Sequence, residues 1–134
     1  MKTFKEKVAV ITGAGSGMGR YLAVLLAKDG ADVCICDVNQ ETLDETAEML
    51  RKYNVSVSSH LLDVSDKESI ESLPQKVIDH HGKIDLVFNN AGVTTGSHFK
   101  DMEEENWNWV MGINFDGVIN STRAFIPHMI DRPE

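Results

Sequence analysis

The sequence predicts an α/β fold in which a doubly wound parallel sheet carries helices on both faces. Short apolar runs rich in β-branched residues alternate with stretches of helical periodicity, and no repeat or linker interrupts the 134 residues. A chain of this length can bury a core, and 42% hydrophobic content is typical of a globular protein. We therefore expect one domain over residues 1–134.

The first half of the chain predicts three strands and two helices. Strands are expected at residues 7–11, 32–37 and 55–62. The first helix should end before Gly30, and Asn39 is a plausible N-cap for the second. The apolar stripe expected to face inward from the first helix consists of Met18, Tyr21, Leu22, Leu25 and Leu26.

The second half predicts a third helix, a fourth strand and a long helix. Ser65, with Glu68 three residues later, predicts a capping box, and Pro74 should kink or split the helix that follows. Residues 84–89 predict the fourth strand, and residues 92–100 form a polar loop. The long helix, residues 102–130, carries apolar residues on more than one face, so one side can pack on the sheet and another on a partner.

A glycine-rich turn lies between the first strand and the first helix. In the run Thr12-Gly13-Ala14-Gly15-Ser16-Gly17-Met18-Gly19, backbone N–H groups and the helix N-terminus can hold a diphosphate. A GxGxxG fingerprint does not fit, whereas TGxxxGxG fits at Gly13, Gly17 and Gly19, with Ser16 and Met18 beside them. The alternative is a turn that only connects a strand to a helix tightly.

Two acidic residues follow strands at the same edge of the expected sheet. Asp37 stands 18 residues after Gly19, near the offset at which an acid binds an adenosine ribose, although it could instead cap the next helix. Its carboxylate would repel the 2′-phosphate of NADP, and no Arg or Lys is near it in the sequence, so NAD is favoured over NADP. Asp63 and Val64 could contact the adenine, and an Asx-type turn is almost equally plausible for Asp63.

The run Asn89-Asn90-Ala91-Gly92 closes the fourth strand. Together with TGxxxGxG, the acid after the second strand and Asp-Val after the third, it resembles the short-chain dehydrogenase/reductase family over the whole chain. The resemblance implies a Rossmann-type fold and an NAD-dependent oxidoreductase that acts on an alcohol/ketone pair. It also implies that Asn90, Ala91 and Gly92 line the cofactor, and that Asn114 is an active-site residue whose main chain holds a water. From the residues alone, Asn114 is a polar residue on a helix face.

The resemblance further implies a catalytic Ser and a YxxxK pair beyond Asn114, and the sequence contains neither: Tyr21 and Tyr53 are not followed by Lys four residues later. Two hypotheses follow. The chain is either a truncated, inactive N-terminal portion of a parent oxidoreductase or a complete, non-catalytic NAD-binding or interaction module. We favour the first, because residues 132–134 fall where a loop should lead into a fifth strand.

Composition and charge restrict the partners. A net charge of -8 and a pI near 5.0 argue against nucleic acid and anionic membranes, and the first apolar run is too short for a secretory signal, so the cytoplasm is expected. Cys34 and Cys36 are interpreted as buried reduced thiols, and no histidine has metal-ligand spacing. His80 and His81 should favour the C-terminal dipole of their helix. A homo-oligomer joined through the long helix is expected.

Overall fold

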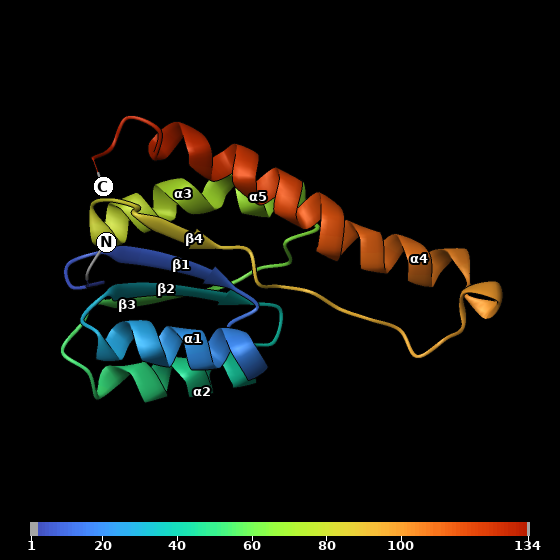
Figure 1. Ribbon diagram of the computed structural model, residues 1–134, viewed down its shortest axis with the longest axis horizontal. Coiled ribbons are helices and arrows are strands. Elements are labelled where there is room, and N and C mark those ends of the chain that lie inside the picture. Colours follow the sequence, from blue (N-terminus) through green and yellow to red (C-terminus); the bar gives the residue numbers. More distant parts are fainter. Residues whose placement is uncertain (1–2, 134) are drawn as a thin grey trace.

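A four-stranded parallel sheet in the order β3-β2-β1-β4 forms the centre of the computed structural model, which describes residues 3–133. The strands are β1 (Val8–Thr12), β2 (Asp32–Asp37), β3 (Val57–Leu61) and β4 (Leu86–Phe88). One face is covered by α1 (Gly17–Lys28) and α2 (Gln40–Arg51), and the other by α3 (Lys67–His81) and α5 (Gly117–Phe125) (Figure 1). The predicted doubly wound fold with four strands is therefore confirmed.

The central strands form the core because their side chains alternate between two apolar layers. Every residue of β1 is buried. Ala9 and Ile11 pack with the layer under α1 and α2, whereas Val8 and Val10 pack with the layer under α3 and α5. Continuous apolar runs of this kind suit a parallel sheet that is covered on both faces. β4 is shorter than the predicted residues 84–89.

The first helix does not bury the stripe predicted for it. Met18, Tyr21 and Leu25 are 82%, 66% and 45% exposed, and only Leu26 of the predicted set is fully buried. The buried residues of α1 are Gly19, Ala23, Leu26 and Ala27. Small side chains on this face let the helix axis lie close to the sheet and to α2.

The helix starts agree with the sequence in one case and differ in another. Asn39 caps α2 as predicted, since its side chain accepts a hydrogen bond from the Thr42 N–H (3.0 Å). The capping box predicted at Ser65 is wrong, because α3 begins after Asp66 and the Ser65 hydroxyl donates to Asp63 instead (2.7 Å). The helix continues through Pro74 and is not split.

The long helix predicted over residues 102–130 is interrupted. A 3₁₀ turn at Phe99–Asp101 precedes α4 (Glu104–Met111), and a π-helical turn at Gly112–Asp116 separates α4 from α5. A second 3₁₀ turn, Ile126–His128, follows. The wide π turn comes just before Gly117, where an added Cβ would lie 2.8 Å from the side chain of Val64. α4 extends past the end of the sheet (Figure 1).

Cys34 and Cys36 are free and buried, as the sequence predicts. Hydrogen bonding with Cys36 lowers the pKa of Cys34, and His60 on β3 adds to this effect. The same pairing, together with burial, raises the pKa of Cys36. No group of three potential ligands that could hold a metal ion is found among residues 3–133. Nor is any helix in this range both long and apolar enough to cross a membrane.

His81 ends α3 beside the edge strand β3, where its Nε2 lies 2.8 Å from the Ser58 hydroxyl. Burial lowers the pKa of His81 to about 4, and the nearby His80 and His60 act in the same direction while Asp32 opposes them. His81 is therefore neutral at pH 7. His80 and His81 stand in the last turn of α3 as predicted, but an uncharged His81 adds no positive charge to the end of the helix dipole at pH 7.

We predict that acid destabilises the fold through His81. Its pKa rises from about 4 in the folded chain toward about 6.5 in the unfolded chain, so the unfolded chain binds more protons between these values. Stability that is present above about pH 6.5 is thus lost as the pH falls toward 4. Urea unfolding at about pH 7.5 and about pH 5 measures the effect.

The variant His81→Gln should weaken the dependence of stability on pH. The control His128→Gln changes an exposed histidine and should leave that dependence unchanged. If His81→Gln loses stability in acid as steeply as the unaltered chain does, His81 is not the responsible group.

Candidate functional site

A cleft of about 320 Å³ opens at the carboxyl ends of the strands. β1 lies between β2 and β4, so the chain leaves the sheet in opposite directions on the two sides of β1, and ligands bind at such switch points in doubly wound sheets. Ten of the eleven residues predicted to bind a cofactor line this cleft, namely Gly13, Ser16, Gly17, Met18, Asp37, Asp63, Val64, Asn90, Ala91 and Gly92. The eleventh, Gly19, is buried.

The glycine-rich turn has a shape that side chains would prevent. Gly13 has φ +65° and Gly17 has φ +54°, a backbone conformation that favours glycine. A Cβ on Gly19 would clash with the carbonyl oxygen of Gly13 and with the amide of Asn90. The missing side chain at Gly19 therefore lets α1 begin directly against the end of β1.

The N-terminus of α1 is open to an anion. Ser16 is the N-cap residue, yet its side chain makes no capping hydrogen bond, and the first turn of α1 contains no acidic residue. Ser16, Gly17 and Met18 are exposed at the cleft. The first N–H groups of a helix lack intrahelical acceptors and carry partial positive charge, so a phosphate group can bind there.

Asp37 is fixed at the end of β2. Its Oδ2 accepts a hydrogen bond from the Gly15 N–H (2.8 Å), and its Oδ1 accepts one from the Val38 N–H (2.7 Å). It does not cap α2, since Asn39 does so. The carboxylate is held with both oxygens in defined positions beside the cleft.

Asp63 makes the Asx-type turn that the sequence left open as an alternative. Its Oδ1 accepts hydrogen bonds from the backbone N–H (2.9 Å) and the hydroxyl (2.7 Å) of Ser65. The same residue lines the cleft next to Val64. Asp63 can therefore form the Asx-type turn and line the cleft at the same time.

Thr12 and Asn90 connect the ends of β1 and β4. The Thr12 hydroxyl accepts the N–H groups of Asn90 and Ala91, both at 3.1 Å, and donates to the Phe88 carbonyl (3.4 Å). The Asn90 amide donates to the carbonyls of Thr12 and Gly13, both at 3.1 Å. Thr12 was missed as a site residue, although it stands first in the TGxxxGxG motif.

Asn114 holds the loop that follows β4. Its Oδ1 accepts the Val93 N–H, and its Nδ2 donates to the Val93 carbonyl, each at 2.8 Å. Asn114 lies in the π-helical turn and is not among the cleft residues, but its neighbour Ile113 is. It is thus more than a polar residue on a helix face, because its side chain fixes the path of another segment.

Five further residues line the cleft and were not predicted: Cys36, Val38, Leu62, Val93 and Ile113. All five adjoin predicted site residues in the sequence, and that adjacency was the signal that could have found them. Among residues 3–133, no Lys or Arg lines the cleft.

Comparison with known proteins decides the family. The family model described as short chain dehydrogenase matches residues 7–134, which is nearly the whole chain. The chain belongs to the short-chain dehydrogenase/reductase family. The resemblance seen in the TGxxxGxG and NNAG motifs is thereby confirmed.

Two curated members of the family show how much of such proteins the chain represents. It is 37% identical to the 3-oxoacyl-[acyl-carrier-protein] reductase FabG of Thermotoga maritima, over 92% of this chain and 50% of the relative. It is 38% identical to the putative oxidoreductase SadH of Mycobacterium tuberculosis, over 97% of this chain and 47% of the relative. The chain therefore spans about half the length of these short-chain dehydrogenases.

Solved structures agree with this relationship. A short-chain dehydrogenase/reductase from Burkholderia phymatum in complex with NAD has a TM-score of 0.92 and 39% identity, over 96% of this chain and 46% of that chain. An NAD⁺-bound xylitol dehydrogenase has a TM-score of 0.92 and 32% identity, over 96% of this chain and 50% of that chain. The fold is thus shared with short-chain dehydrogenases whose structures contain NAD.

We predict that Gly19→Ala disrupts the turn. The added methyl group meets the Gly13 backbone and the hydrogen-bonded amide of Asn90, neither of which is free to move. The free energy of unfolding should therefore fall by about 2 kcal/mol. Gly96→Ala is the control, because nothing lies within 4 Å of its added Cβ. Urea denaturation of both variants checks this, and equal stability of the two would show that the close approach does not matter.

Proposed function

We propose that residues 1–134 form the dinucleotide-binding part of an NAD-dependent oxidoreductase that acts on an alcohol/ketone pair. The observation that carries the proposal is the cleft in which the open N-terminus of α1 and the fixed carboxylate of Asp37 lie together. NAD, when bound, supplies the chemistry of hydride transfer.

The residues of the cleft fit this cofactor. The N–H groups at Ser16, Gly17 and Met18 would hold the diphosphate, and Gly13 and Gly19 would leave room for it. The acidic residues of the cleft fit the adenosine part of NAD. Asp37 would accept hydrogen bonds from the hydroxyl groups of the adenosine ribose, and Asp63 with Val64 would border the adenine.

At the other end of the cleft, Asn90, Ala91 and Gly92 would border the nicotinamide ribose. Their position beside β1 is supported by the hydrogen bonds from Thr12. Asn114 would serve as the active-site residue whose main chain holds a water for proton transfer. This role is supported by the position of Asn114 in the π-helical turn, where the main-chain hydrogen bonds depart from the α-helical pattern.

NAD is favoured over NADP on electrostatic grounds. A 2′-phosphate next to Asp37 would place two like charges together, and the cleft residues include no cation to offset the repulsion. The free thiols of Cys34 and Cys36 are in keeping with the reducing cytoplasm that we propose as the location.

We expect NAD⁺ to bind more tightly than NADP⁺ by roughly tenfold, a difference of about 1.4 kcal/mol, as measured by calorimetric titration of each. Asp37→Ala should narrow this ratio, because it removes both the ribose acceptor and the repulsion. Asp79→Ala removes the same charge from an exposed site on α3 and serves as the control. Equal or tighter binding of NADP⁺ by the unaltered chain would contradict the proposal.

Residues 1–134 alone are not expected to turn over a substrate. Neither Tyr21 nor Tyr53 is followed by Lys four residues later, so no tyrosine with a neighbouring lysine is available as the general acid. The second candidate function, a non-catalytic NAD-binding or interaction module, is favoured by this observation. Turnover by a longer protein that contains these residues together with a Ser and a YxxxK pair would support the oxidoreductase, and its absence would support the non-catalytic module.

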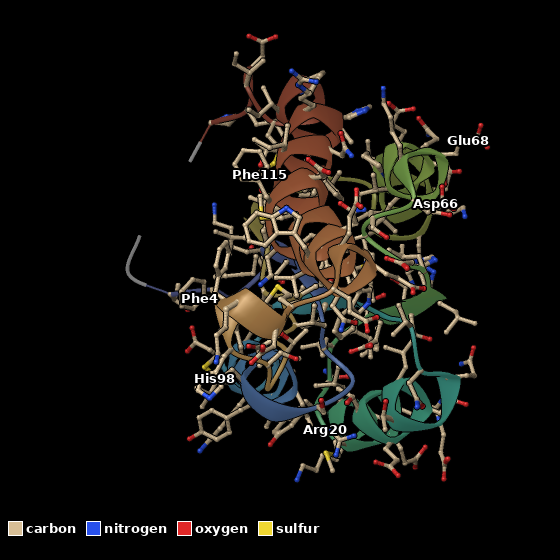
Figure 2. All side chains as sticks on the ribbon, turned by 90° about the vertical axis from the view of Figure 1, so that its right-hand side faces the viewer. Phe4, Arg20, Asp66, Glu68, His98 and Phe115 are labelled. Carbon is tan, nitrogen blue, oxygen red and sulfur yellow. The ribbon has the colours of Figure 1, made fainter. Side chains whose placement is uncertain are left out.

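We further propose that the protein forms a homo-oligomer through the segment predicted as the long helix, residues 102–130, at a surface that runs from the π-helical turn along α5 to the residues after it. Phe115, Ile119, Ile126 and Ile130 are 55%, 39%, 49% and 72% exposed. Phe115 lies on the side of the helix away from α3 (Figure 2). Apolar side chains grouped in this way are typical of an association surface. β4 is also an edge of the sheet among residues 3–133, with backbone groups open to pairing.

Sedimentation at micromolar concentration should show a dimer or larger species, because the exposed apolar side chains gain burial on association. Ile119→Glu should shift the chain toward the monomer, whereas Met49→Glu, on the exposed side of α2, should not. A compact monomer of the unaltered chain would contradict this assembly.

A further inference from the structure

Arg20 stands in the first turn of α1, and its side chain reaches α2 (Figure 2). Its side chain is 23% exposed. Nη2 donates to the carbonyls of Gly15 and Thr42, the second at 3.0 Å, and Nε donates to the Thr46 hydroxyl at 2.9 Å. One guanidinium thus joins the turn to two successive turns of α2.

Thr46 extends this network to the neighbouring peptide. It is fully buried, and its hydroxyl donates to the Ala14 carbonyl at 2.9 Å while it accepts from Arg20. The carbonyl of Ala14 is therefore satisfied by Thr46 of α2 and that of Gly15 by Arg20 of α1, and neither donor lines the cleft. Buried acceptors held in this way resist reorientation, because turning them would leave them without partners.

Gly15 connects Arg20 to Asp37. Its carbonyl is held by Arg20, and its N–H is donated to the Asp37 Oδ2 at 2.8 Å. The surroundings are tight, since a Cβ on Gly15 would lie 2.8 Å from that same oxygen and 2.7 Å from the Thr42 hydroxyl. A shift of Gly15 would therefore move the carboxylate that faces the cleft.

Arg20 is already paired with a carboxylate. Glu45 on α2 accepts from its Nη2 at 2.8 Å, and Glu45 is 53% exposed. No Arg or Lys is near Asp37 in the sequence, yet the fold brings Arg20 close to the turn. Because its Nε and Nη2 bond to two carbonyls, a hydroxyl and Glu45, and Arg20 does not line the cleft, we interpret its effect on the site as one of geometry.

We propose that Arg20 is a positioning residue: by holding Gly15, it fixes the orientation of Asp37 and so sets the preference for NAD over NADP. The inference rests on the proposed function, since it concerns the same cleft. A loosened Asp37 makes poorer hydrogen bonds to a ribose, whereas its repulsion of a 2′-phosphate depends less on orientation. Loss of Arg20 therefore weakens NAD binding more than NADP binding.

The test is calorimetric titration of NAD⁺ and NADP⁺ with Arg20→Met and Arg20→Lys, each checked for folding by circular dichroism. We expect NAD⁺ affinity to fall roughly tenfold, the size expected for lost hydrogen bonds to a charged group, and the NAD⁺/NADP⁺ ratio to narrow. Arg20→Lys keeps the charge, but an ammonium cannot span the same acceptors, so it should narrow the ratio as well.

Arg51→Met is the matched control, because Arg51 also pairs with a glutamate of α2 but is exposed and remote from the turn. It should leave the ratio unchanged. In an Asp37→Ala background, Arg20→Lys should have little further effect on the ratio, because the two residues act through one another.

The outcomes separate the two proposals. If the unaltered chain binds neither dinucleotide, the proposed function fails. If it binds NAD⁺ preferentially and folded Arg20→Lys keeps the full preference, only the role of Arg20 is overturned, and this holds even if Arg20→Met does not fold.

Discussion

The structure depends on the contact between Gly19 in the first turn of α1 and the carbonyl of Gly13 at the end of β1. No side chain fits between them, and the amide of Asn90 occupies the remaining space while it satisfies that carbonyl. This contact places a helix N-terminus at the switch point of the sheet. Without it, the open N–H groups of α1 would lie farther from Asp37 and from the end of β4.

The polar groups of the turn are divided between the protein and the cleft. Those that point inward have partners: Gly13 O with Asn90, Ala14 O with Thr46, Gly15 N with Asp37, and Gly15 O with Arg20. Those at the start of α1 lack side-chain partners. A receptor built in this way is preorganised, because little further ordering is needed when a ligand arrives.

The elements and the cleft residues could be predicted because they depend on local pattern. Strand composition, the Asn39 cap and the motif glycines each reflect a preference of a single residue or a short run. The buried face of α1 could not be predicted in this way. Large apolar residues at Met18, Tyr21 and Leu25 have helical spacing, but the face of α1 that is buried consists mainly of small residues, with Leu26 as its one large side chain.

The contacts made by Arg20, Thr46 and Thr12 were missed for a different reason. Apart from the bonds of Arg20 to Gly15 and of Thr46 to Thr42, their side-chain bonds join residues 22 to 79 positions apart, and no periodicity or spacing rule relates such pairs. The pKa of His81 likewise depends on burial against β3, which the end of a helix does not reveal in the sequence. Long-range polar contacts follow from the fold and become visible only when the fold is known.

The floor of the cleft is part of the hydrophobic core. Cys36, Val64 and Ile113 line the cleft and also pack in the apolar layer under α3 and α5. Ile113 reaches this position from the π-helical turn, next to Asn114, which holds Val93. The interruption of the long helix therefore has two effects at once: it completes the core and fixes the segment that follows β4. A change in core packing on this side of the sheet must alter the cleft, because the same side chains form both.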